Sequence, residues 1–69
     1  MMTIKKTRWG NEIHWELTSD HPIDEIIAQD AQIIEGYHPG GYDFVGFATE
    51  QLKISKKFRA TWRCYDNCE

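Results

Sequence analysis

The chain has 69 residues, of which 41 % are hydrophobic, 13 % are aromatic and 28 % are charged. This length predicts a single domain, residues 1–69, with a thin core, and the apolar content argues against a disordered chain. No apolar run approaches the length of a membrane span, and no apolar segment follows the N-terminal lysines as in a signal peptide. We therefore expect a cytoplasmic protein that has no membrane partner and, for want of room for a deep cleft, no enzymatic activity and no cofactor.

Charge is unevenly distributed along the chain. Residues 1–10 carry three bases and no acid, residues 11–50 carry nine acids and no Lys or Arg, and residues 51–69 carry five bases and two acids. Two interpretations are open. Either the basic ends neutralise the acidic middle in the fold, or an acidic surface around the helix meets a basic partner.

The first two elements form an antiparallel hairpin in our prediction. Residues 3–9 and 12–18 alternate apolar and polar side chains, and a Gly-Asn turn signal separates them. A two-residue loop would place Lys6 opposite Trp15 on the buried face. That register requires the lysine stem to lie across the indole, and a different loop length is the alternative.

Residues 19–36 are predicted to form one helix. Ser19 or Asp20 can cap its N-terminus. Pro22 suits the first turn, where the amide that proline lacks would have no partner within the helix. Gly36 provides the C-terminal stop. One apolar stripe is expected to face a sheet, and it consists of Ile23, Ile26, Ile27, Ile33 and Ile34.

Two further strands follow a loop at residues 37–41. Residues 42–50 form an aromatic strand in which Gly46 marks a bulge or a close backbone approach, and residues 51–56 turn the chain. Residues 57–65 are the clearest strand, with one apolar face and one basic face. The apolar face contains Phe58, Ala60, Trp62 and Cys64, and the other contains Lys57, Arg59, Thr61, Arg63 and Tyr65.

The predicted fold is therefore α+β with the order ββαββ, one helix packed on a four-stranded antiparallel sheet. A single helix cannot cover a wide sheet. We expect exposed aromatic side chains or a homodimer contact on the uncovered part.

Cys64 and Cys68 are four residues apart and leave several interpretations open. A zinc site needs about four ligands, and the remaining candidates are His14, His21 and His38. A disulfide requires the last residues to turn back and an oxidising compartment. The remaining alternative is two reduced thiols, with Cys64 packed in the core. The usual redox motif has two residues between its cysteines, whereas Cys64 and Cys68 have three, so the spacing argues against a redox site.

Two charged surfaces could contact a partner. The basic face with Arg59, Arg63 and Tyr65 could bind nucleic acid, although the net charge of −3 and the acidic middle oppose a polyanion, so that direct nucleic-acid binding is disfavoured. The acidic region could instead occupy a basic, nucleic-acid-binding groove of another protein. The predicted contact residues are Asp20, Asp24, Glu25, Asp30, Glu35, Tyr37, Tyr42 and Tyr65.

The second half of the chain resembles a group of very small proteins of bacteria and their phages. The shared pattern is a His-Pro-x-Gly-Tyr loop that leads into an aromatic strand, followed by a Trp-x-Cys-x-x-x-Cys ending. In this chain the loop begins at His38 and the ending spans Trp62 to Cys68, and Asp43 stands where the pattern has a small residue. The resemblance implies a mobile-element context, in which small non-enzymatic proteins often inhibit host defence, as anti-CRISPR proteins do.

The leading hypothesis is a non-catalytic protein-binding module, a phage-encoded inhibitor of a bacterial defence (CRISPR-Cas) complex that acts through its acidic surface. The alternatives are a nucleic-acid-binding domain that uses the last strand, and a small metal or redox protein that uses the two cysteines.

Overall fold

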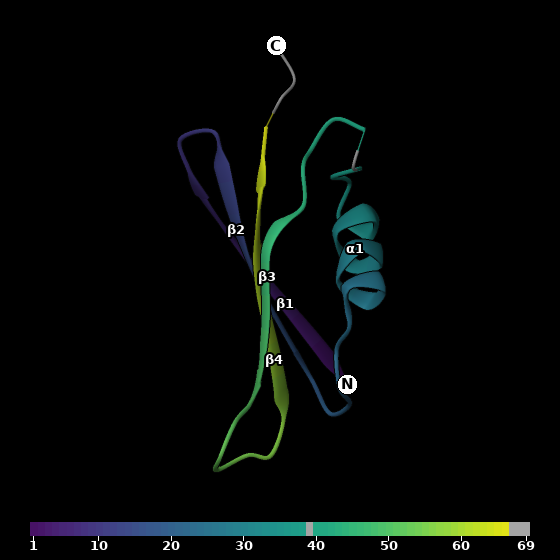
Figure 1. Ribbon diagram of the computed structural model, residues 1–69, viewed down its shortest axis with the longest axis vertical. Coiled ribbons are helices and arrows are strands. Elements are labelled where there is room, and N and C mark those ends of the chain that lie inside the picture. Colours follow the sequence, from purple (N-terminus) through teal and green to yellow (C-terminus); the bar gives the residue numbers. More distant parts are fainter. Residues whose placement is uncertain (39, 67–69) are drawn as a thin grey trace.

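The computed structural model describes residues 1–38 and 40–66 and has the predicted ββαββ order (Figure 1). The elements are β1 (Met2–Trp9), β2 (Glu12–Ser19), α1 (Glu25–Ile34), β3 (Val45–Gln51) and β4 (Phe58–Tyr65). The four strands form one antiparallel sheet in the order β1-β2-β4-β3. The helix packs on one face, which confirms the predicted α+β architecture.

The core lies between α1 and the two central strands. In the register of β2 and β4, Trp15 pairs with Trp62 and Ile13 with Cys64. The two indoles are stacked, with ring centroids 5.8 Å apart and an interplanar angle of 6°. The predicted apolar face of the last strand is thus confirmed as core. The buried apolar residues are Ile13, Trp15, Leu17, Ile23, Ala28, Ala60, Trp62 and Cys64.

A short polar network ties the helix to the sheet inside this core. The Trp62 indole nitrogen donates to Gln32 Oε1 at 2.9 Å, and Gln32 Nε2 donates to the Tyr37 carbonyl oxygen at 2.9 Å. The Trp15 indole nitrogen lies 3.2 Å from Cys64 Sγ, to which it donates. Every buried side-chain nitrogen and oxygen in the described part of the chain has a partner. The network therefore carries no desolvation penalty from an unpaired group.

The first hairpin has the two-residue loop considered above. Trp9 pairs with Glu12, and Gly10 has a φ of +64°, as the first position of a type II′ turn requires. This register places Lys6 opposite Trp15, and the Lys6 ammonium lies 5.9 Å from the centroid of the Trp15 ring. The Lys6 ammonium therefore lies over the indole face, an arrangement that allows a charged side chain on an otherwise apolar face.

The helix begins later than predicted. Ser19 is the last residue of β2, too far before α1 to cap it, and its Oγ accepts a hydrogen bond of 3.1 Å from the His21 amide. Asp20 and Pro22 precede α1 as well. The N-cap is Asp24, whose Oδ1 accepts a hydrogen bond of 2.8 Å from the Ile27 amide. The prediction of residues 19–36 was wrong at its start because the sheet extends β2 through Ser19.

The third strand is shorter than predicted. It begins at Val45 instead of residue 42, and Tyr42 lies outside the strand, where it pairs with Asp66 in an isolated bridge. The pairing with β4 shifts register between Val45 and Ala48, where Gly46 has a φ of +69°. A Cβ at Gly46 would lie 2.8 Å from Arg63 Nη1. The predicted bulge is confirmed, and the group that closely approaches Gly46 is the Arg63 side chain rather than another backbone segment.

In residues 1–38 and 40–66, no helix has the length and apolar character needed to cross a membrane.

Candidate functional site

The acidic residues of the predicted contact surface divide into structural and unpaired groups. Asp24 caps α1, Asp20 Oδ2 accepts a hydrogen bond of 2.9 Å from the Met1 amino group, and Glu35 Oε1 lies 3.3 Å from the Lys6 ammonium. Glu25 and Asp30 have no ion-pair partner among the described residues. These two carboxylates are therefore the ones on α1 that remain available to a partner.

The ion pair of Asp20 also affects its ionisation. The hydrogen bond from the Met1 amino group, with the charge of that group and of Lys57, lowers the pKa of Asp20 below its usual value. Asp20 thus stays ionised and faces the Met1 amino group and Lys57, which directly precede β1 and β4. This pairing agrees with the interpretation in which the basic ends neutralise the acidic middle.

The three predicted tyrosines lie in different places. The Tyr37 ring meets the Trp15 ring edge-on, with ring centroids 5.2 Å apart, and its centroid lies 4.8 Å from that of the Tyr42 ring. Both tyrosines are half-buried and pack against the core. Tyr65 alternates with the buried Cys64 on β4 and therefore lies on the sheet face opposite the helix. The predicted contact residues thus do not lie on one surface.

Exposed apolar side chains on α1 are the feature that sequence reasoning missed. Ile26 is 70 % exposed and Ile34 is 82 % exposed, whereas the predicted stripe placed both in the core. The helix turns Ala28 and Gln32 to the sheet. Positions two residues away on a helix lie about 200° around its axis, so Ile26 and Ile34 point outward. The assignment of Ile26 and Ile34 to the core was wrong. The sequence signal against it was the wide spread of apolar residues around the helix, because not all of them can face one sheet.

An apolar groove runs between β1 and α1 next to these isoleucines. It has a volume of about 370 Å³. It is lined by Met2, Ile4, Leu17, Ile27, Asp30, Ala31, Ile34 and Glu35. We call Glu25, Ile26, Asp30 and Ile34, together with this groove, the α1 margin. Its chemistry is apolar with carboxylates at the rim.

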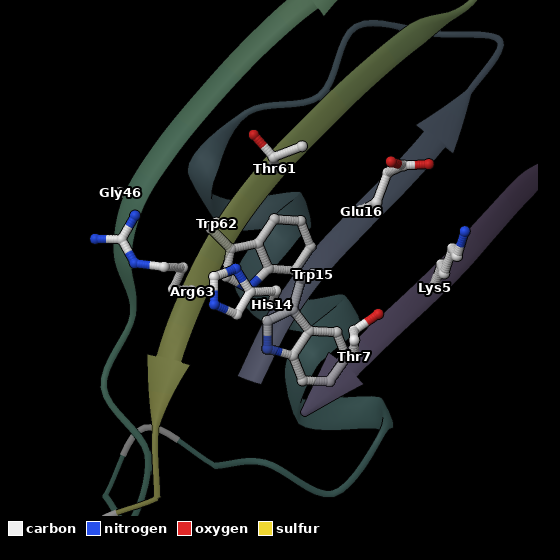
Figure 2. A pocket seen from close by; sticks show the side chains of 9 residues that line it. All are labelled: Lys5, Thr7, His14, Trp15, Glu16, Gly46, Thr61, Trp62 and Arg63. Atoms are coloured by element: carbon white, nitrogen blue, oxygen red, sulfur yellow. The ribbon is translucent and has the colours of Figure 1, made fainter. Parts of the chain in front are cut away.

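The opposite face of the sheet carries a polar hollow of about 340 Å³. Figure 2 shows side chains of β1, β2 and β4 around it, with the Arg63 guanidinium beside the Gly46 backbone of β3. The lining residues are Lys5, Thr7, His14, Trp15, Glu16, Gly46, Thr61, Trp62 and Arg63. Bases and an acid alternate here, so the hollow has no single charge with which to select a ligand.

Ion pairs neutralise the basic face predicted for nucleic acid. Arg59 Nε donates to Glu50 Oε2 at 3.1 Å, and this hydrogen bond raises the pKa of Arg59. Arg63 Nε and His14 Nε2 lie 3.8 Å and 3.5 Å from the same Glu12 oxygen. A strand whose bases face carboxylates at these distances offers little attraction to phosphates.

The cysteine predictions are only half covered by the described chain. Cys64 is buried and has no disulfide partner among the described residues, and burial raises the pKa of its thiol despite the hydrogen bond from Trp15. Cys68 lies outside the described residues, so the disulfide stays a prediction. In residues 1–38 and 40–66 no three His, Cys, Asp or Glu side chains come together in a way that could hold a metal ion.

Comparison with known proteins gives no relative from which a role could be taken. No protein-family model, no curated protein and no solved structure matches the chain.

Proposed function

We propose that the chain is a non-catalytic protein-binding module that contacts its partner through the α1 margin. The observation that carries the proposal is the exposure of Ile26 and Ile34 on either side of Asp30, beside an apolar groove. Large apolar side chains grouped on a small soluble domain are typical of interaction sites. Burial of one isoleucine side chain at an interface contributes about 1.5–3 kcal/mol.

The partner presents apolar side chains surrounded by lysine and arginine in this proposal. Glu25 and Asp30 are the unpaired carboxylates of the α1 margin, and charge complementarity speeds association and excludes acidic partners. A basic nucleic-acid-binding surface has this chemistry, since it is built to receive phosphates. The resemblance to small phage proteins supports a partner that belongs to a bacterial defence complex such as CRISPR-Cas. The chain would bind this complex in the host cytoplasm and inhibit it.

Affinity capture from a host lysate tests the proposal as a whole. The tagged chain is incubated with lysate before and after nuclease treatment, and retained proteins are identified by mass spectrometry. We expect a retained nucleic-acid-binding protein whose capture survives nuclease and is competed by added oligonucleotide. If the folded chain retains nothing specific, or if capture is lost with nuclease, the proposal is wrong.

Charge neutralisation then tests the surface. The variant Glu25→Gln/Asp30→Asn leaves the Asp24 cap in place, so that the helix stays intact. We expect the affinity for the captured partner to fall by about three- to tenfold and its salt dependence to flatten. The matched control Glu16→Gln/Asp43→Asn removes the same charge outside α1 and should bind as the parent chain does. Equal affinity for both variants would rule out the acidic surface.

A further inference from the structure

The α1 margin borders the free edge of β1. β1 is a terminal strand of the sheet order, and Figure 1 shows it running past the end of α1 near the N-terminus. In an antiparallel pair, alternate residues direct their backbone amide and carbonyl away from the neighbouring strand. The Trp9–Glu12 pair closes the two-residue loop and is of the hydrogen-bonded kind, so Ile4, Lys6 and Arg8 present theirs outward.

The charges on β1 oppose pairing with a second copy. Two-fold antiparallel pairing that continues the sheet overlaps most when it centres on Lys5 or Lys6 of the eight-residue strand. A lysine then lies directly opposite its own copy, and like charges in that position destabilise the pair. Like-charge repulsion thus disfavours pairing of β1 with a second copy of itself, whereas a segment of different charge can pair with this edge.

We propose that β1 accepts an extended segment of the partner as an added strand, with alternate side chains of that segment entering the groove between β1 and α1. This inference rests on the proposed protein-binding function. Backbone hydrogen bonds along the strand edge would supply affinity, and the groove would supply specificity. Lys6 closes one end of the groove, because its ammonium lies 4.8 Å from the Tyr37 ring centroid and 3.3 Å from Glu35 Oε1. The open part therefore lies beside Met2 and Ile4.

The walls define the chemistry of the segment. Met2, Ile4, Ile27 and Ile34 select apolar side chains at every second position, the spacing that a strand presents to one face. Asp30 at the rim, which has no ion-pair partner in the described chain, selects a lysine or arginine on the groove side. On the other face Lys5, also without an ion-pair partner among those residues, selects a carboxylate.

Phage display tests the segment without knowledge of the natural partner. Random peptides of about ten residues, enough to span β1 as an extended strand, are selected on the immobilised full chain. We expect enriched peptides in which every second residue faces the groove. These groove-side residues should be apolar except for one lysine or arginine that meets Asp30. The best peptide, added to ¹⁵N-labelled protein, should slow hydrogen exchange at the Ile4, Lys6 and Arg8 amides by about tenfold or more.

A charge reversal at the rim provides the specificity test. Asp30→Lys should weaken binding of the best peptide by about tenfold and shift selection toward acidic peptides. Asp43→Lys, the same reversal outside the groove, should change neither.

Three outcomes would overturn strand addition. They are a failure to enrich any peptide, enrichment of apolar residues at helical spacing, and binding that leaves the outward amides of β1 exchanging as before. The proposed function is judged separately by capture of the partner from lysate. If capture succeeds and depends on Glu25 and Asp30 while strand addition fails, the module binds through α1 alone.

Discussion

The central strands and the α1 margin use large apolar side chains in opposite ways. Trp15 and Trp62 are each 2 % exposed, stacked on one another, and their indole nitrogens are hydrogen-bonded. Ile26 and Ile34, on the outer side of α1, are mostly exposed to water. The comparison indicates that stability is concentrated between β2, β4 and the inner side of α1. The exposed isoleucines of the margin are then free to serve binding, because removing the side chains of Ile26 and Ile34 leaves the core intact.

The largest effect is expected at the centre. Trp62→Ala removes a fully enclosed ring and leaves a cavity, which costs about 3–5 kcal/mol. A domain of this size has only about 3–10 kcal/mol of stability. We therefore expect the variant to be largely unfolded at 25 °C, as measured by near- and far-UV circular dichroism. A variant that kept its near-UV signal and unfolded cooperatively in urea would show that stability is not concentrated between β2, β4 and α1.

Gln32 should show a smaller effect of a different origin. Gln32→Leu keeps most of the volume but leaves the Trp62 indole N–H and the Tyr37 carbonyl without their partner. An unpaired buried polar group costs about 1–3 kcal/mol, which urea unfolding of the variant would measure. Gln29→Ala, on a less buried side of the same helix, serves as the control. Equal stability of the two variants would mean that the network contributes nothing.

The sequence predicted the element order, the last strand and the bulge at Gly46, because local signals dominate there. Alternation from Phe58 to Cys64 is unbroken, and a glycine inside a strand often marks a bulge or a close backbone approach. Residues 19–24 were misassigned, since Ser19 is a good helix cap by composition and only pairing across the sheet makes it the end of β2. Tertiary context overrode the local preference.

The candidate site was less predictable for the same reason. The acidic charge of α1 could be read directly, but the ion pairs that occupy Asp20 and Glu35 depend on strand register. The inward position of Gln32 could not be predicted either. A glutamine is buried here because Trp62 presents an indole N–H at that point. Once Gln32 faces inward, helix geometry turns Ile34 out to solvent.

The helix cap should have an intermediate effect. Asp24→Ala removes the side-chain acceptor of the Ile27 amide and should lower the free energy of unfolding by about 1 kcal/mol. Asp24→Asn retains an acceptor and should recover most of that loss in the same urea titration. If alanine and asparagine destabilise equally, the charge of Asp24 at the helix start matters more than its hydrogen bond. If alanine has no effect, a different residue caps the helix.

The smallest effect on stability is expected at the margin, where the effect on binding should be largest. In Ile26→Ser/Ile34→Ser both side chains are already exposed, and serine and isoleucine have similar helix propensities, so the free energy of unfolding should stay within about 0.5 kcal/mol of the parent. Affinity for the captured partner, measured by calorimetry, should fall by at least about tenfold, as loss of buried apolar area requires. Ile54→Ser is the matched control, since Ile54 is 99 % exposed in the turn between β3 and β4 and lies outside the α1 margin. Loss of stability with the double variant would place these isoleucines in the core after all, and unchanged affinity would mean that the partner binds elsewhere.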